Sequence, residues 1–190
     1  MSPDANMSRD EALTLLREHV KSPAMIKHCL ASEAVMRAAA KRLGQDEAAW
    51  GLAGLLHDLD VELTGGDMNT HGLKTAEMLA ARGVAPDIVE AIRMHNETAA
   101  GVKRSAAFHK ALAACETITG LVIATTLVYP DKKLASVKPS SVVKRMKEKA
   151  FAASVDRDVI RECEAIGIPL PEFAQLAVSA MLAIAGELGL

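Results

Sequence analysis

Residues 53–60 read Ala-Gly-Leu-Leu-His-Asp-Leu-Asp and place a histidine and an aspartate side by side at the end of an apolar helical stretch. An imidazole and a carboxylate are costly to bury unless they are paired or bind a metal. Other candidate ligands lie at widely spaced positions beside apolar runs, namely His28, His71, His95 and Glu116. Together with His57 and Asp58 they are numerous enough to hold a metal centre of one or two ions.

Helix signals dominate the rest of the chain, and strand signals are nearly absent. Ser8 and Glu11 form a capping box for a first helix ending near Val20, and Ser22-Pro23 begins a second that stops at Gly44. Further helices are expected to begin at Asp46, at Asn69 or Thr70, and at Pro86, Ser105, Pro139, Asp156 and Pro169. The last of these should end near Gly189, and Gly65-Gly66 marks a loop over residues 64–68. The pattern predicts an all-α fold, a helical bundle.

Length and composition predict one domain over residues 8–190, preceded by a disordered leader at 1–7. Aromatic residues make up only 3% of the chain, so the core must consist of aliphatic side chains and methionine. The net charge of −2 gives no sign of a nucleic-acid or membrane partner. Three cysteines without a CxxC motif indicate reduced thiols in a cytoplasmic protein. No apolar run reaches the roughly 18 residues of a membrane span.

The candidate ligands fall on five of the expected helices or helix ends. His28 lies early in the second helix, His57 and Asp58 end the third, His71 begins the fourth, His95 ends the fifth, and Glu116 lies inside the sixth. A helical bundle can bring such positions to one central point. Imidazole and carboxylate ligands suit iron, manganese, zinc or nickel. Because short motifs such as HExxH are absent, tertiary packing must assemble the site.

Each candidate also has an ordinary structural interpretation. A single histidine on an apolar helix is more often a hydrogen-bonded core residue than a ligand, and Asp58 could simply cap the turn that follows it. Glu116 could lie on a solvated helix face, although the alanines around it and Gly120 favour close packing. His19 is expected to be solvated. His109 shares a helix face with Glu116, but a role away from the site is the simpler interpretation. The basic pairs and the run from Lys144 to Lys149 are expected to be solvated.

The order of these residues resembles the HD-domain metal-dependent phosphohydrolase superfamily, in its small single-domain HDIG-type group. The phrase ending in His57-Asp58, the histidine 29 positions upstream and the two histidines downstream carry the resemblance, which covers about residues 27–127. Residues 130–190 are then expected to form a C-terminal helical cap. The sequence departs from the family twice, with Glu116 in place of an aspartate and Leu59-Asp60 in place of Ile-Gly.

The resemblance implies a ligand set and a reaction. One metal is expected on His28, His57, Asp58 and Glu116, and a second on His71 and His95, with Asp58 bridging. His57 and Asp58 would be the catalytic residues, and a metal-bound hydroxide would attack the phosphorus of a small phosphorylated substrate. A nucleotide is the expected substrate, although one Trp, one Tyr and three Phe offer no obvious clamp for a base. Two alternatives stay open, a di-iron oxygenase of the same superfamily and a non-catalytic ligand-binding or regulatory module.

Overall fold

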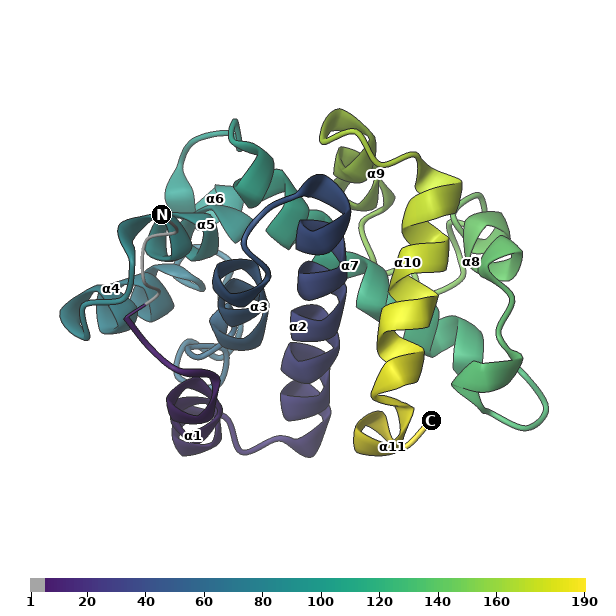
Figure 1. Cartoon of the computed structure of the whole chain (residues 1–190), viewed down its shortest axis with the longest axis horizontal. Helices are drawn as coiled ribbons and strands as arrows, with labels where there is room; N and C mark the ends of the chain where they lie inside the picture. The colour runs from purple at the N-terminus through teal and green to yellow at the C-terminus, as the bar shows by residue number, and fades with distance from the viewer. Residues whose placement is uncertain (1–5) are drawn as a thin grey trace.

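The computed structural model describes residues 6–190, which form helices joined by turns and contain no strand (Figure 1). The helices of the N-terminal part are α1 (Arg9–His19), α2 (Pro23–Leu43), α3 (Glu47–Leu56), α4 (Leu73–Ala81), α5 (Pro86–His95), α6 (Glu97–Ala100) and α7 (Ala107–Leu127). The C-terminal part contains η1 (Leu134–Ser136), α8 (Pro139–Arg145), α9 (Arg157–Ala165), α10 (Leu170–Ala183) and α11 (Ala185–Leu188). The all-α prediction is confirmed.

The first three helices begin where their capping residues predicted. Ser8 and Glu11 form the reciprocal capping box of α1, and the Ser22 hydroxyl accepts from the backbone of α2. Gly44 ends α2 in the left-handed conformation, with φ +65°, and the Asp46 carboxylate caps α3. These ends satisfy backbone groups that a helix leaves without internal partners.

The prediction that Asn69 or Thr70 caps the fourth helix was wrong. Turns run from His57 to Gly72, and α4 begins only at Leu73. The reason is an acid from outside the helix: the Asp60 carboxylate accepts from the backbone N–H groups of Gly72 and Thr75, at 2.8 and 3.1 Å. A carboxylate at a helix N-terminus is favourable because it meets unpaired N–H groups and the positive end of the helix dipole.

Smaller differences concern the ends of later helices. Ala106, and not Ser105, is the N-cap of α7, and it contributes no side-chain bond. The expected last helix is divided at Ile184 into α10 and α11, and the short α6 and η1 were not predicted. Of the predicted leader, residues 1–5 lie outside the described part of the chain. The Asn6 amide donates to the Gly83 carbonyl at 3.1 Å.

Helix α2 carries His28, and α3 ends at its C-cap His57. The two helices lie side by side in the middle of the bundle (Figure 1). A glycine permits their close approach, because a Cβ at Gly54 would lie 2.7 Å from the Ser32 carbonyl oxygen. Gly54 lies within one helical turn of His57, and Ser32 lies about one turn after His28. The close contact between Gly54 and Ser32 therefore holds the two histidine-bearing helices together.

Helix α7 passes through the bundle and contacts α2, α5 and α9. By length and composition alone it could span a membrane, but 61% of its most apolar window is buried inside the molecule. The contacts within the bundle account for its apolar character. A single hydrophobic cluster includes residues from α1, from α7 and from the C-terminal helices α8 to α11, so the expected cap packs on the same core as the rest.

Candidate metal centre

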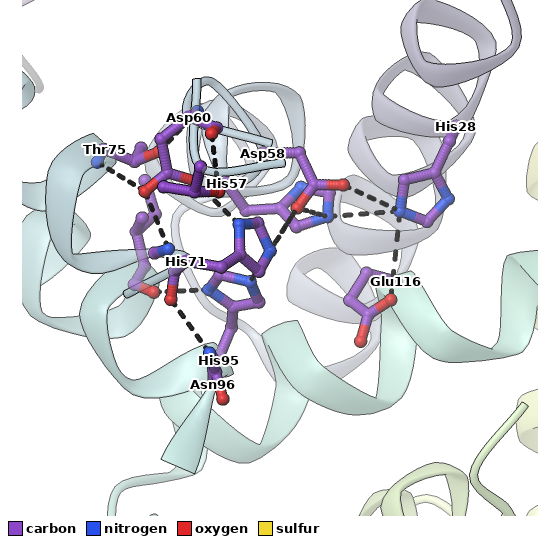
Figure 2. A network of polar contacts seen from close by, with 12 residues as sticks. His28, His57, Asp58, Asp60, His71, Thr75, His95, Asn96 and Glu116 are labelled. Atoms are coloured by element: carbon purple, nitrogen blue, oxygen red, sulfur yellow. Dashed lines mark hydrogen bonds and ion pairs between the residues drawn. The ribbon is translucent and has the colours of Figure 1, made fainter. Parts of the chain in front are cut away.

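Four histidines and Asp58 meet at one point inside the bundle (Figure 2). His28 comes from α2, His57 and Asp58 follow the last turn of α3, His71 lies in the turn before α4, and His95 is the last residue of α5. His57, Asp58 and His71 are buried, and the side chain of His28 is 21% exposed. The sequence therefore named five residues that the structure brings together.

The five residues form two groups that share Asp58, one with His28 and His57 and the other with His71 and His95. In the first group the two Nε2 atoms are 3.2 Å apart, and Asp58 lies 3.3 Å from His57 and 3.6 Å from His28. In the second group the two Nε2 atoms are 3.1 Å apart, and Asp58 Oδ1 lies 3.1 Å from His71 and 3.8 Å from His95. A carboxylate in this position can bridge two cations.

The rear nitrogen of every ring faces an oxygen. The Nδ1 atoms lie 3.1 Å from Thr119 Oγ1 for His28, 2.9 Å from the Gly54 carbonyl for His57, 2.7 Å from Asp60 Oδ1 for His71 and 2.6 Å from the Ile92 carbonyl for His95. The Thr119 hydroxyl donates to the Glu116 carbonyl at 2.7 Å, so its lone pair is available to accept from His28. Each ring thus keeps its proton on Nδ1 and directs Nε2 inward, the arrangement of metal-bound imidazoles.

This arrangement fits a metal ion. With their protons on Nδ1, His28 and His57 point two lone pairs at each other across 3.2 Å. Such a contact is repulsive unless a cation lies between the lone pairs. Imidazole nitrogens and one carboxylate are the donors that iron, manganese, zinc and nickel accept.

Burial and the two acids Asp58 and Asp60 set the protonation of the centre. Burial lowers the pKa of His28 and of His95 to about 4, so both rings are neutral at pH 7. Burial also opposes charge on His71, but its contacts with Asp58 and Asp60 raise the pKa of that ring to about 10. The surrounding imidazoles hold the pKa of Asp58 far below its ordinary value, against the effect of burial.

Asp60 contacts the centre directly, whereas the sequence placed it only near the site. Its side chain is fully buried, and its carboxylate accepts from the His71 ring while it caps α4 (Figure 2). The Asn96 amide holds the same turn by donating to the His71 carbonyl at 2.9 Å. Gly72 gives the necessary space, because a Cβ there would lie 2.8 Å from the His95 ring. The available signal was the acid itself, two residues after Asp58, where the family pattern has a glycine.

Glu116 points toward the centre from α7 but lies outside both groups (Figure 2). Its Oε2 atom is 3.9 Å from His28 Nε2, and its other oxygen accepts from the Thr117 hydroxyl. Burial, with some help from Asp58, raises the pKa of the Glu116 carboxyl to about 8. A divalent cation nearby would favour the ionised form. The assignment of Glu116 as a ligand stays a prediction.

Two histidines have no part in the centre. His19 is half-buried at the end of α1, and His109 lies near Glu90 and Arg93. The Nδ1 atom of His109 is buried without a hydrogen-bond partner among the described residues.

A pocket of about 460 Å³ opens beside the centre. His28, His95 and Glu116 form part of its wall, and the rest comes from residues 96–98, Arg104, Thr117, Gly120, Met68 and the segment 154–159 at the start of α9. Arg104 joins the two sides: its guanidinium contacts the Glu162 carboxylate of α9 at 2.7 Å and donates to the His95 carbonyl at 2.9 Å. The C-terminal cap thus forms one wall of the pocket.

The helical bundle collects four inward-facing imidazoles around one carboxylate, a set of donors that could hold a metal ion. The sequence of residues 25–123, just over half of the chain, matches the family model described as HD domain, and the protein belongs to the HD domain family. Members of this superfamily are in general metal-dependent hydrolases. No match was found among curated proteins or among solved structures.

Proposed function

We propose that the protein is a phosphohydrolase that depends on one or two divalent ions of iron, manganese, zinc or nickel. The observation that carries the proposal is the pair of ligand groups sharing Asp58 on the wall of a pocket. Bound metal ions would neutralise charge on phosphoryl oxygens and lower the pKa of a water molecule. The expected substrate is a small phosphorylated molecule.

The residues of the chain have distinct tasks in this proposal. Asp58 is the shared carboxylate, and its ionised state is maintained by the imidazoles around it. The Gly54 carbonyl and Asp60 fix the orientation of His57 and His71 from behind. Glu116 completes the ligands of the His28 side. The cap segment 154–159 forms one wall of the pocket in which the rest of the substrate would lie.

Two other functions use the same residues. A di-iron oxygenase would bind iron as a pair and consume oxygen, and a regulatory module would bind a ligand without turnover. The retained ligand set favours an active centre over the regulatory module, because the four rear hydrogen bonds turn all four Nε2 atoms toward one shared site.

The test is metal analysis of the purified protein, followed by a panel of phosphomonoesters and phosphodiesters with added manganese, cobalt or iron. We expect one to two bound ions per chain and phosphate release that stops with a chelator. His57→Ala should lose both metal and activity, whereas His109→Ala, outside the centre, should keep both. Paired iron with oxygen consumption and no phosphate release would establish the oxygenase instead. A protein that takes up no metal would overturn both enzymatic functions.

The location of the protein is also a proposal. Cys29, Cys115 and Cys163 are buried free thiols, as expected in a reducing compartment. We infer that the protein is cytoplasmic, without a nucleic-acid or membrane partner.

A further inference from the structure

The wall of the pocket beside the metal centre combines two groups of residues. The first group, His28, His95 and Glu116, belongs to or adjoins the metal centre. The second group consists of Glu97, Thr98 and the first residues of the cap, including Ser154 and Asp156. The part of a substrate that is not bound by metal ions would meet the second group.

The cation on the described wall of the pocket is already paired. Arg104 is the only lysine or arginine among the described residues that line it. Its Nε and Nη2 atoms contact Glu162, its Nη1 atom donates to the His95 carbonyl, and its side chain is only 6% exposed. Lys103 lies outside this pocket and pairs with Glu97 at 2.7 Å. No cation on the described wall is therefore left for a second anionic group of a ligand.

One acid of the described wall, in contrast, has no cation beside it. Glu97 accepts from Lys103 Nζ and from the backbone N–H of Arg104, both at 2.7 Å, and Glu116 adjoins the metal centre. Asp156 caps α9 through Oδ1 alone, at 2.8 Å from the Asp158 N–H, and forms no ion pair with a described lysine or arginine.

The wall also lacks a stacking platform. Apart from the two imidazoles of the metal centre, the described residues that line the pocket include no aromatic side chain, and their apolar members are Met68, Val155 and Val159. Polar groups such as the Thr98 and Thr117 hydroxyls are present instead. Base recognition commonly relies on aromatic stacking, which this wall cannot supply.

We propose that the pocket selects compact phosphomonoesters whose remaining part is neutral or positively charged, and discriminates against substrates with a second anionic group, polyphosphates included. This inference rests on the proposed function and narrows its substrate. The physical cause is repulsion, because a second anionic group would approach Asp156 while the described wall offers it no free cation. Like charges that face each other across a binding surface oppose binding and confer specificity. A nucleoside triphosphate is thereby excluded from the preferred substrates.

The test uses a charge series of similar size on the manganese-loaded protein. The probes are 2-aminoethyl phosphate, glycerol phosphate and phosphoglycolate, whose non-phosphate parts are cationic, neutral and anionic, with ATP as the polyphosphate. Binding is measured by calorimetry and turnover by phosphate release. We expect affinity and kcat/KM to fall in that order, with phosphoglycolate about tenfold or more below 2-aminoethyl phosphate. ATP should be the poorest or be inactive.

Asp156→Asn tests the assigned residue. Asparagine is as good an N-cap as aspartate, so the variant removes the charge and keeps the start of α9. We expect it to reduce the preference for 2-aminoethyl phosphate over phosphoglycolate several-fold. Asp158→Asn removes one charge from the same turn but outside this pocket, and should leave the preference unchanged. Equal losses in both variants would overturn the role of Asp156.

The outcomes separate this inference from the proposed function. Hydrolysis of ATP or phosphoglycolate as efficient as that of 2-aminoethyl phosphate overturns the inference and leaves the phosphohydrolase intact. The expected order in calorimetry without hydrolysis of any probe supports the charge selectivity and overturns the phosphohydrolase. Failure of the metal-loaded protein to bind any probe, inorganic phosphate included, overturns both.

Discussion

The two halves of the metal centre share Asp58 and differ in what stands behind their histidines. Behind His28 and His57 are neutral acceptors, a threonine hydroxyl and a backbone carbonyl. In the other half His95 also faces a backbone carbonyl, but behind His71 is the buried carboxylate of Asp60. The pKa values follow this difference, because burial lowers that of His28 to about 4, whereas Asp58 and Asp60 overcome burial and raise that of His71 to about 10.

The difference shows that the residue behind a histidine sets whether its ring is neutral or protonated before a metal binds. A ring backed by a neutral oxygen offers its lone pair at neutral pH. A ring between two carboxylates keeps a proton on Nε2 until a metal displaces it. Metal binding to the His71 half must therefore release a proton from His71 at neutral pH. On the His28 half both rings can bind without releasing a proton, and one is released only when Glu116, with its pKa of about 8, ionises to ligate the metal.

The largest effect is expected when both halves lose their common ligand. Asp58→Ala should remove metal from both groups and reduce phosphate release to background, because it removes the shared charge. Metal analysis and the phosphatase assay measure this. Glu164→Ala, an exposed acid on α9, is the control, and an unchanged helical circular-dichroism signal shows that the fold survives. An Asp58→Ala protein with full metal content and activity would rule out the shared-carboxylate centre.

A substitution of Asp60, behind His71, should weaken metal binding to one half of the centre and not to the other. Asp60→Asn keeps the size of the side chain but removes its charge, so metal affinity of the His71 half should fall about 10- to 100-fold. The His28 half should keep its metal, and the stoichiometry in a titration should approach one ion per chain. Glu77→Gln, exposed on α4, should change neither. Equal weakening of both halves would show that Asp60 acts only on the fold.

Substitutions of Glu116 test metal binding to the His28 half. If it ligates the metal of His28 and His57, Glu116→Ala should lower metal content at that half by several-fold and lower activity with it, and Glu116→Asp should keep part of both. The side chain lies close to His28 already, and a small movement would bring it into contact with the ion. Unchanged metal stoichiometry in Glu116→Ala would remove the glutamate from the ligand set.

The smallest expected effect is a pH dependence of stability in metal-free protein. The pKa of His71 is raised from 6.5 to about 10, so its stabilising contribution is complete below pH 6.5 and is lost as the pH rises toward 10. The pKa of His28 is lowered from 6.5 to about 4, so stability is lost as the pH falls from 6.5 toward 4.

Urea unfolding in the presence of a chelator measures both contributions. Relative to wild type, His71→Gln should lose most stability near pH 6 and little near pH 10. His28→Gln should reduce the loss of stability between pH 6.5 and 4. Parallel pH profiles for all three proteins would show that the two halves do not differ in protonation.

The sequence predicted the fold well wherever the signal was local. Ser8, Ser22 and Asp46 cap their helices from adjacent positions, and such contacts can be read from spacing. The start of α4 could not be read in this way, because its cap is Asp60, at a distance of 12 residues from Gly72. The capping residues nearest in sequence are Asn69 and Thr70, and the sequence therefore predicted one of these as the cap.

The same reasoning explains what could be predicted of the site. The five converging candidate ligands were found because histidines beside apolar runs are few, and the family pattern orders them. The contact between Asp60 and His71 depends on the turns over residues 57–72, which no periodicity describes. The charge of the pocket depends on Arg104 being paired with Glu162, 58 residues away, and only tertiary structure shows that pair.

The Arg104–Glu162 pair also couples the local opening of α9 to the metal centre. The Arg104 guanidinium donates to the His95 carbonyl at the end of α5, and it also pairs with Glu162 on α9, the cap helix beside the pocket. Local opening of α9 must therefore break bonds that also steady a metal ligand, and an ion that steadies the ligand makes this opening rarer. Slower hydrogen exchange of the α9 amides would then indicate that a metal ion is bound at the centre.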